Sequence, residues 1–165
     1  MASPLVCATP VDLAFLPFRQ QPPAPALPGG FELRSDLTPS PEAINQLLAS
    51  CCEATPPAER WPAALERSLW HLCILERATG DLVGFVRVTS DQALNANLWN
   101  LAARPGPLQG ELLAVLVHRA LNGLRKDLPG CSISIAAPPA ALDALKTQGF
   151  VLDPGGIRAM GLRLR

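Results

Sequence analysis

The feature that most constrains the fold is a long amphipathic segment in the C-terminal half of the 165-residue chain. Its apolar residues recur at the spacing of one helical face: Leu112, Leu113, Leu116, Val117, Ala120, Leu121 and Leu124. Arg125 and Lys126 follow, and Pro129-Gly130 then ends the pattern, as expected at a helix C-terminus. Because this apolar face has to be buried, the sequence predicts a long helix packed against another layer of the domain.

Apolar runs on both sides of this helix are typical of strands. Residues 70–76 and 82–89 are joined by Ala78-Thr79-Gly80-Asp81, which predicts a hairpin. Residues 94–103 are a third strand candidate, although three asparagines interrupt the run. After the helix, Ile133, Ile135 and Ala137 alternate with the small residues Ser132, Ser134 and Ala136, which predicts a strand with one buried face.

Two short helices and a first strand are predicted upstream of the hairpin. Phe31-Glu32-Leu33-Arg34 alternates apolar and charged residues, as a half-buried strand does. Ser40 is a suitable N-cap for a helix with Pro41 in its first position. That helix carries its apolar residues on one face: Ile44, Leu47, Leu48 and Cys51. A second helix is predicted from Trp61, with Pro62 in its first turn.

The C-terminal part completes the order of elements. It predicts a helix over residues 140–147, a strand over 149–152, a turn over 153–156 and a last strand over 157–164. The whole order is a strand, two helices, three antiparallel strands, a helix, a strand, a helix and two strands. This order predicts an α/β or α+β fold with a mixed sheet and helices on its faces.

The first 29 residues differ in composition from the rest of the chain. They hold seven of the 18 prolines and only two charges. Residues 20–28 have polyproline character, which predicts a flexible extension over residues 1–29 and one domain over residues 30–165. Residues 11–16 are more apolar than a solvated tail requires; they are either a docking arm or an irregular part of the extension.

Charge and cysteine content exclude several classes of function. Fourteen basic residues balance fourteen acidic ones, so no net field favours nucleic acid or an anionic membrane. Twelve of the basic residues are arginine, a bias typical of a GC-rich, bacterial-like genome. The five cysteines and two histidines form no spacing suited to a zinc site. No run of roughly 20 apolar residues suggests a membrane span. From these features together we expect a reduced, cytoplasmic protein without metal.

Three short motifs resemble the Gcn5-related N-acetyltransferase (GNAT) superfamily. Ala144 to Phe150 is similar to the end of a GNAT domain, where a short helix finishes in Gly-Phe. Gly80 to Phe85 resembles the segment with which the family's hairpin begins. Met160-Gly161-Leu162 resembles part of the family's last strand. The resemblance covers residues 30–165 and implies a central, mostly antiparallel sheet with helices on both faces.

The resemblance also implies acetyl-CoA as cosubstrate, bound where the fourth and fifth strands separate. The backbone of Leu101, Ala102 and Ala103 would then meet pantetheine, while Gln109, Gly110 and Glu111 would lie at the pyrophosphate. Side chains around this turn depart from the family's Arg/Gln-x-x-Gly-x-Gly/Ala loop.

Gly110 can serve as the central glycine of that loop. Pro107 stands where the family has an arginine, and Leu112 stands where it has a second small residue. The carboxylate of Glu111 would repel a diphosphate. The family's loop can also be aligned in a second register, with Arg104 as the basic residue and Gly106 as the glycine that follows it. Asn100 is predicted to be a polar residue on an exposed face, with a bulge position as the alternative.

Catalytic residues are harder to predict, because the family's usual general acid is a tyrosine and this chain has none. Leu145 lies at the nearest position, and Cys131, Ser134 and Thr147 are other residues expected near the thiol. The candidates for a general base are Glu76, Asp91 and His71.

Two functions follow from these observations. The first is an N-acetyltransferase that moves an acetyl group from acetyl-CoA to an amine on a small molecule or a protein. The alternative is a GNAT-like binding or regulatory module that has lost acetyl transfer. The oligomeric state stays open, a homodimer being one option. An open gap beside residues 101–103 would favour the acetyltransferase. A gap filled by the side chain of Leu108 or Leu112 would favour the non-catalytic module.

Overall fold

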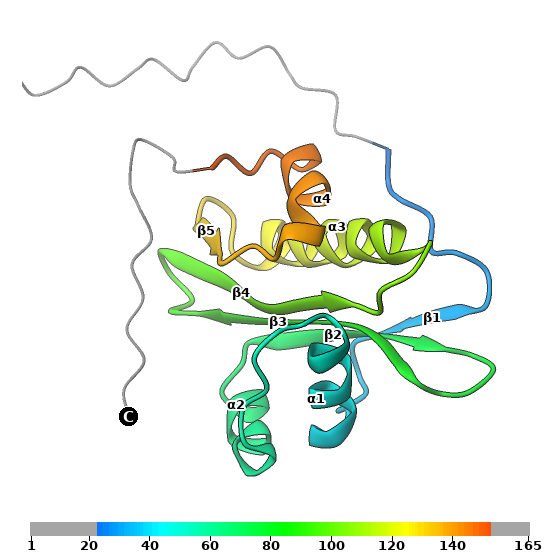
Figure 1. Cartoon of the computed structure of the whole chain (residues 1–165). Coiled ribbons are helices and arrows are strands. Elements are labelled where there is room, and N and C mark those ends of the chain that lie inside the picture. The colour runs from blue at the N-terminus through cyan, green and yellow to red at the C-terminus, as the bar shows by residue number, and fades with distance from the viewer. Residues whose placement is uncertain (1–22, 153–165) are drawn as a thin grey trace, which may run out of the picture.

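A computed structural model describes residues 23–152 as one sheet with helices on both faces. The five strands lie in the order β1-β2-β3-β4-β5 (Figure 1). Pairing is antiparallel from β1 to β4, and β5 is parallel to β4. The strands are β1 Phe31–Arg34, β2 Trp70–Glu76, β3 Leu82–Ser90, β4 Asn95–Ala103 and β5 Ser132–Ile135.

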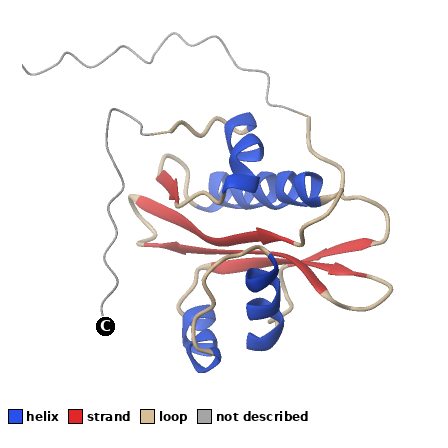
Figure 2. Ribbon diagram, viewed as in Figure 1, coloured by secondary structure: helices blue, strands red, loops and turns tan. Residues whose placement is uncertain are grey.

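The helices form two layers, one on each face of the sheet (Figure 2). One layer holds α1 Pro41–Ser50 and α2 Trp61–Glu66, and the other holds α3 Gln109–Asp127 and α4 Leu142–Thr147. Short 3-10 turns, η2 Ala58–Arg60 and η3 Pro139–Ala141, precede α2 and α4. The predicted fold class, the central hairpin and the long helix are confirmed.

Local sequence explains where α1 begins and what it covers. The Ser40 hydroxyl accepts a hydrogen bond from the Ala43 amide at 3.1 Å, and Pro41 occupies the first turn, as predicted. The buried face of α1 belongs to a core cluster with Trp61 and Phe85, whose rings meet edge to face at 6.2 Å. The larger cluster fills the opposite side, beneath the apolar face of α3.

The predicted strand over residues 149–152 is wrong. Gly149 has a φ of +96°, a conformation that suits the end of a helix rather than a strand. Its amide donates to Lys146 O at 2.9 Å, and the Phe150 amide donates to Leu145 O at 3.1 Å. This pair of bonds is a Schellman motif that closes α4 and prevents the backbone from joining a ladder.

Several predictions fall on residues outside the described range. These are the turn over 153–156, the strand over 157–164 with Met160-Gly161-Leu162, and most of the extension over 1–29. Within that extension, Leu27 is described and packs, half-buried, against the larger core cluster. The domain boundary at residue 30 stays a prediction.

The preferred interpretation of Asn100 is also wrong, because this residue forms a bulge. The register pairs Phe85 with Ala102 but Arg87 with Trp99, so β4 carries one residue more than β3 over this stretch. Asn100 takes up the extra length with a φ of 55°. Asparagine tolerates this left-handed conformation better than most residues, and the bulge turns its side chain toward Arg87.

Candidate functional site

The gap predicted between the fourth and fifth strands is present. Strand β5 pairs with β4 only from Ser132 to Ile135, opposite Asn95 to Leu98. Beyond that point β4 continues to Ala103 without a strand partner on this edge in the described part of the chain. The cause is local, since Pro138 and Pro139 follow β5 closely and have no amide hydrogen with which to extend the ladder.

Two adjoining cavities occupy this gap. The first has a volume of about 180 Å³ and is lined by Leu101, Ala102 and Ala103 of β4 together with Gln109 of α3. The second, of about 210 Å³, is lined by Trp99 to Leu101 and by Ala136 after β5. Three residues line both the first and the second cavity: Glu53, Leu101 and Pro138. Neither Leu108 nor Leu112 is among the residues that line them, so the gap is open in the described structure.

The N-terminus of α3 borders the first cavity through Gln109, and the next two amides have no backbone acceptor among the described residues. Gln109 N donates to Gly106 O at 3.1 Å, and Leu112 N donates to Leu108 O at 3.0 Å. The amides of Gly110 and Glu111 have no backbone acceptor among the described residues. Gly110 is exposed, and a Cβ built there meets no atom within 4 Å. Free amides at the positive end of a long helix suit an anion such as a diphosphate.

Side chains fix this helix start against β4. Gln109 Nε2 donates to Ala103 O at 3.0 Å, and Cys51 Sγ donates to the same oxygen at 3.2 Å. Burial raises the pKa of Cys51, so its thiol stays protonated and able to donate at neutral pH. Of the predicted cofactor residues, Leu101, Ala102, Ala103 and Gln109 line the first cavity. Gly110 and Glu111 follow Gln109 in the first turn of α3 and are not among its lining residues.

In the second register of the loop, the basic residue has another partner in this structure. Arg104 donates to a carboxylate oxygen of Glu76 at 2.9 Å, which holds the guanidinium at the end of β2. Gly106 instead supports the turn, with a φ of +151° that favours glycine. Glu111 is exposed in the first turn of α3, where a negative charge opposes the binding of a diphosphate.

The proposed bases have structural partners elsewhere. Glu76 pairs with Arg104, and Asp91 Oδ1 accepts three backbone N–H bonds at 2.8 to 3.0 Å in the turn between β3 and β4. These bonds lower the pKa of Asp91 to about 2, which makes it a poor proton acceptor. His71 Nε2 lies 2.8 Å from Leu37 O. None of the three residues lines either cavity.

The residues considered as general acids are likewise engaged. Leu145 is buried in the larger core cluster, and Cys131 packs against the same cluster. Ser134 Oγ donates to Asn97 Oδ1, and Thr147 Oγ1 donates to Asp143 O at 2.8 Å. The position that resembles the family's tyrosine therefore carries a core side chain.

Sequence reasoning missed Glu53, the carboxylate that lines both cavities. It lies in the loop after α1, where no periodic pattern marks it. Cys52 adopts a φ of 58° and the Glu53 amide donates to Leu48 O at 2.9 Å, so a tight turn brings this residue back to the gap. Only the fold shows that a residue 48 positions before Leu101 faces the same cavity.

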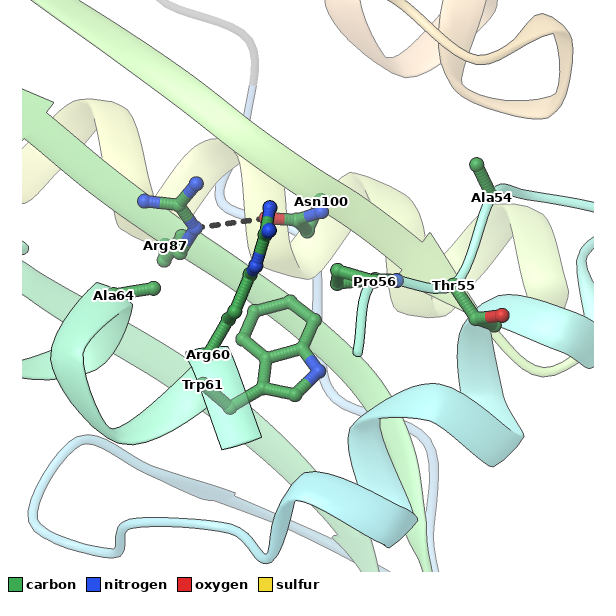
Figure 3. A pocket seen from close by; sticks show the side chains of 8 residues that line it. All are labelled: Ala54, Thr55, Pro56, Arg60, Trp61, Ala64, Arg87 and Asn100. Atoms are coloured by element: carbon green, nitrogen blue, oxygen red, sulfur yellow. Dashed lines mark hydrogen bonds between the residues drawn. The ribbon is translucent and has the colours of Figure 1, made fainter. Parts of the chain in front are cut away.

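A third cavity, of about 330 Å³, adjoins the second and was also missed. It shares Ala54 and Asn100 with the second cavity. Its remaining lining residues come from the loop before α2, from α2 and from β3: Thr55, Pro56, Arg60, Trp61, Ala64 and Arg87 (Figure 3). The three cavities thus follow β4 from the start of α3 to the bulge and onto the face covered by α2.

Comparison with known proteins identifies the family. No profile of a known family matches the chain. The chain is 29% identical over 119 residues to the uncharacterized N-acetyltransferase ycf52 of Pyropia yezoensis, covering 71% of the chain and 68% of the relative. It is 37% identical over 82 residues to the chloroplastic GCN5-related N-acetyltransferase 2 of Arabidopsis thaliana. That match covers 48% of the chain and 30% of the plant protein. The chain belongs to the GNAT superfamily.

Solved GNAT structures show the same architecture. A probable acetyltransferase of Staphylococcus aureus superposes with a TM-score of 0.71 at 15% identity, covering 81% of this chain and 99% of that protein. The GNAT-family acetyltransferase of Streptococcus pneumoniae gives a TM-score of 0.59 at 16% identity, over 82% of the chain and 98% of that protein. At these identities the likeness establishes the GNAT fold.

The described residues 23–152 carry neither a metal-binding cluster nor a membrane-spanning helix. No group of three or more histidine, cysteine, aspartate or glutamate side chains is arranged there to hold a metal ion. None of the helices described there has both the length and the apolar character needed to cross a membrane.

Proposed function

We propose that this GNAT protein moves an acetyl group from acetyl-CoA to an amine along the open edge of β4. The observation that carries the proposal is the gap beside residues 101–103, which Gln109 also lines. Gln109 directly precedes Gly110 and Glu111, whose amides have no backbone acceptor among the described residues. Backbone groups on an unpaired strand edge can bind pantetheine, and the amides at the start of α3 can bind the diphosphate. These contacts do not depend on the side chains that depart from the family's loop.

Acetyl transfer requires few side chains. The amine nitrogen attacks the thioester carbonyl carbon, so that a C–N bond forms and the C–S bond breaks. The amine loses one proton to a base, and the thiolate of coenzyme A gains one. Glu53 is the one carboxylate among the lining residues of the first two cavities, and we assign it the role of base. With Leu145 buried, we expect the thiolate to take its proton from solvent.

The alternative is a GNAT-like module that binds without turnover. Two observations favour it. The side chain at the tyrosine position is apolar and belongs to the core, and Glu111 places a negative charge next to the anion site. Both would slow the reaction, since one removes a proton donor and the other weakens diphosphate binding.

Isothermal titration of the full chain with acetyl-CoA tests the proposal, and release of coenzyme A in the presence of amines separates the two candidates. We expect a dissociation constant below about 1 mM, the upper end of common substrate affinities. Binding without release of coenzyme A supports the module, and no binding at millimolar concentrations contradicts both.

A pair of variants locates the bound diphosphate. Gly110→Asp adds a charge beside the free amides and is expected to weaken acetyl-CoA binding by about fivefold or more. Asn122→Asp makes the same change of charge at an exposed position in the second half of α3 and should leave the affinity unchanged. Equal effects of the two substitutions would place the diphosphate elsewhere.

A further inference from the structure

The third cavity is lined by two arginines and, among residues 23–152, by no acidic side chain. Arg60 and Arg87 both line it, and its other lining residues are neutral (Figure 3). Arg60 comes from the turn before α2 and Arg87 from β3, so two separate elements bring guanidinium groups to one cavity. A cavity of this composition is complementary to an anion.

Arg87 is half-buried and has no counter-charge among the described residues. The ion pairs among the described residues involve only Arg34 and Arg104. Burial lowers the pKa of Arg87, but a guanidinium remains charged at neutral pH. A partly desolvated cation without an anion is unfavourable, and a bound carboxylate or phosphate would relieve this cost.

Neutral groups hold the Arg87 guanidinium in place from two sides. Its Nε donates to Asn100 Oδ1 at 2.8 Å (Figure 3). Its Nη1 donates to Ser68 Oγ at 3.4 Å. Ser68 Oγ in turn donates to Ala64 O at 2.7 Å, which leaves its lone pairs free to accept from Arg87. The guanidinium carbon also lies 5.8 Å from the centre of the Trp99 ring. Arg87 is thus preorganised while retaining further N–H groups for a ligand.

The walls of the cavity are also fixed. Asn45 Nδ2 donates to Pro56 O at 2.9 Å, and Trp61 Nε1 donates to Asn45 Oδ1 at 2.8 Å. One asparagine of α1 therefore ties the loop before α2 to the buried tryptophan of α2. The volume of about 330 Å³ lies at the small end of ligand sites, which favours a small molecule.

Its position relates this cavity to acetyl transfer. Because it shares Ala54 and Asn100 with the second cavity, an anion held by Arg87 leaves the rest of a small acceptor directed toward the β4 gap. We propose that the acceptor is a small amine with a carboxylate or phosphate group, and that Arg87 binds this group with Arg60 as a second cation. Acetylation of the amine depends on the proposed enzymatic function. Binding of the anionic group by Arg87 does not depend on it.

Matched amines test the proposal. Rates of coenzyme A release are measured with the full chain for β-alanine against propylamine and for phosphoethanolamine against ethanolamine. Within each pair the anionic group is the main difference, and the two pairs separate carboxylate from phosphate. We expect kcat/KM to be about 10- to 100-fold higher for the anionic member of at least one pair, as for a charged hydrogen bond. Equal rates within both pairs, or a preference for the uncharged amines, overturn the proposal.

Variants assign the preference to Arg87. Arg87→Met keeps the apolar stem and should abolish the preference, whereas Arg87→Lys should retain part of it. Arg119→Met removes an exposed arginine of α3 and serves as the control. Acetyl-CoA affinity and the thermal unfolding curve verify that each variant is folded. A preference that survives in Arg87→Met overturns the assignment.

Binding measured without catalysis keeps the two proposals separate. Isothermal titration with phosphoethanolamine, ethanolamine, β-alanine and propylamine needs no acetyl-CoA. If an anionic amine binds in an Arg87-dependent way but no coenzyme A is released, the anion site stands and the proposed enzymatic function fails. If acetyl-CoA is consumed but neither anionic amine is bound better than its partner, the enzymatic function stands and the anion site fails.

Discussion

Gly84 of β3 pairs with Ile74 of β2, whose side chain lies close to the glycine. A Cβ built on this glycine would lie 3.1 to 3.3 Å from three side-chain atoms of Ile74, which is fully buried. Real Cβ contacts are rarely that short, and the surrounding core has little room to adjust. The glycine of the family-like Gly80 to Phe85 motif is therefore explained by packing within the hairpin.

Gly84→Ala is accordingly expected to lower the free energy of unfolding by about 1–3 kcal/mol, the usual cost of overpacking. Urea denaturation measures this change. Gly110→Ala is the matched control, because nothing lies within 4 Å of its Cβ position and alanine favours a helix by up to about 1 kcal/mol. A Gly84→Ala protein as stable as the original would contradict the packing explanation.

The proposed base is the second residue whose role can be measured. Glu53→Gln keeps the size of the side chain but removes its ability to take a proton. We expect kcat/KM to fall by about 100-fold near neutral pH, with acetyl-CoA affinity unchanged. Glu66→Gln, at an exposed position of α2, should have no effect. If Glu53→Gln retains full activity, the amine loses its proton by another route.

Among the elements, the start of α3 combines features that favour and oppose diphosphate binding. Its amides and dipole attract an anion, whereas the Glu111 carboxylate repels one. Glu111→Gln should therefore tighten acetyl-CoA binding by about two- to fivefold, corresponding to roughly 0.3–1 kcal/mol. Isothermal titration at low ionic strength measures this gain in affinity most clearly, because salt screens exposed charges.

Asp127→Asn is the control for this prediction. Asp127 is exposed at the opposite end of α3, about 24 Å away at 1.5 Å per residue. The substitution removes the same charge from the same helix without changing the candidate site. If both substitutions raise the affinity equally, net charge rather than the local field of Glu111 explains the result.

Elements with a strong local signal could be predicted from the sequence. The apolar period of α3, the Ser40-Pro41 cap of α1 and the hairpin turn at Gly80 each act over a few residues. The strand predicted at 149–152 failed because its apolar residues follow a glycine that closes α4. There the Schellman motif outweighed strand propensity, which depends on packing context.

The candidate site was predictable only in part, because its residues meet through the fold. The backbone positions 101–103 and 109–111 followed from the family resemblance, which requires little of the side chains. The Asn100 bulge depends on the register between β3 and β4, and Glu53 reaches the gap through a turn with positive φ. No spacing in the sequence joins Arg60 to Arg87, which line the same cavity from different elements.

On the scale of the whole molecule, β4 is where the two halves of the fold meet. It is antiparallel to β3 along its length and parallel to β5 only at its start. One core cluster lies beneath α1 and α2 and the other beneath α3 and α4, with residues of β4 in both. The open edge of β4 therefore lies between two well-packed layers, so that a ligand can bind there without disturbing either core.

This arrangement predicts where acetyl-CoA will slow amide exchange in the intact protein. Hydrogen exchange followed by mass spectrometry should show protection in peptides covering residues 99–103 and 109–112, and little change in β1 or α1. At a free concentration ten times the dissociation constant, exchange that requires the unliganded state should slow by about tenfold. Adenosine 3′-phosphate 5′-diphosphate, which keeps the diphosphate but lacks pantetheine, should protect the α3 start but not residues 99–103. Protection spread evenly over the sheet, or confined to β1 and β2, would show that the ligand does not bind along β4.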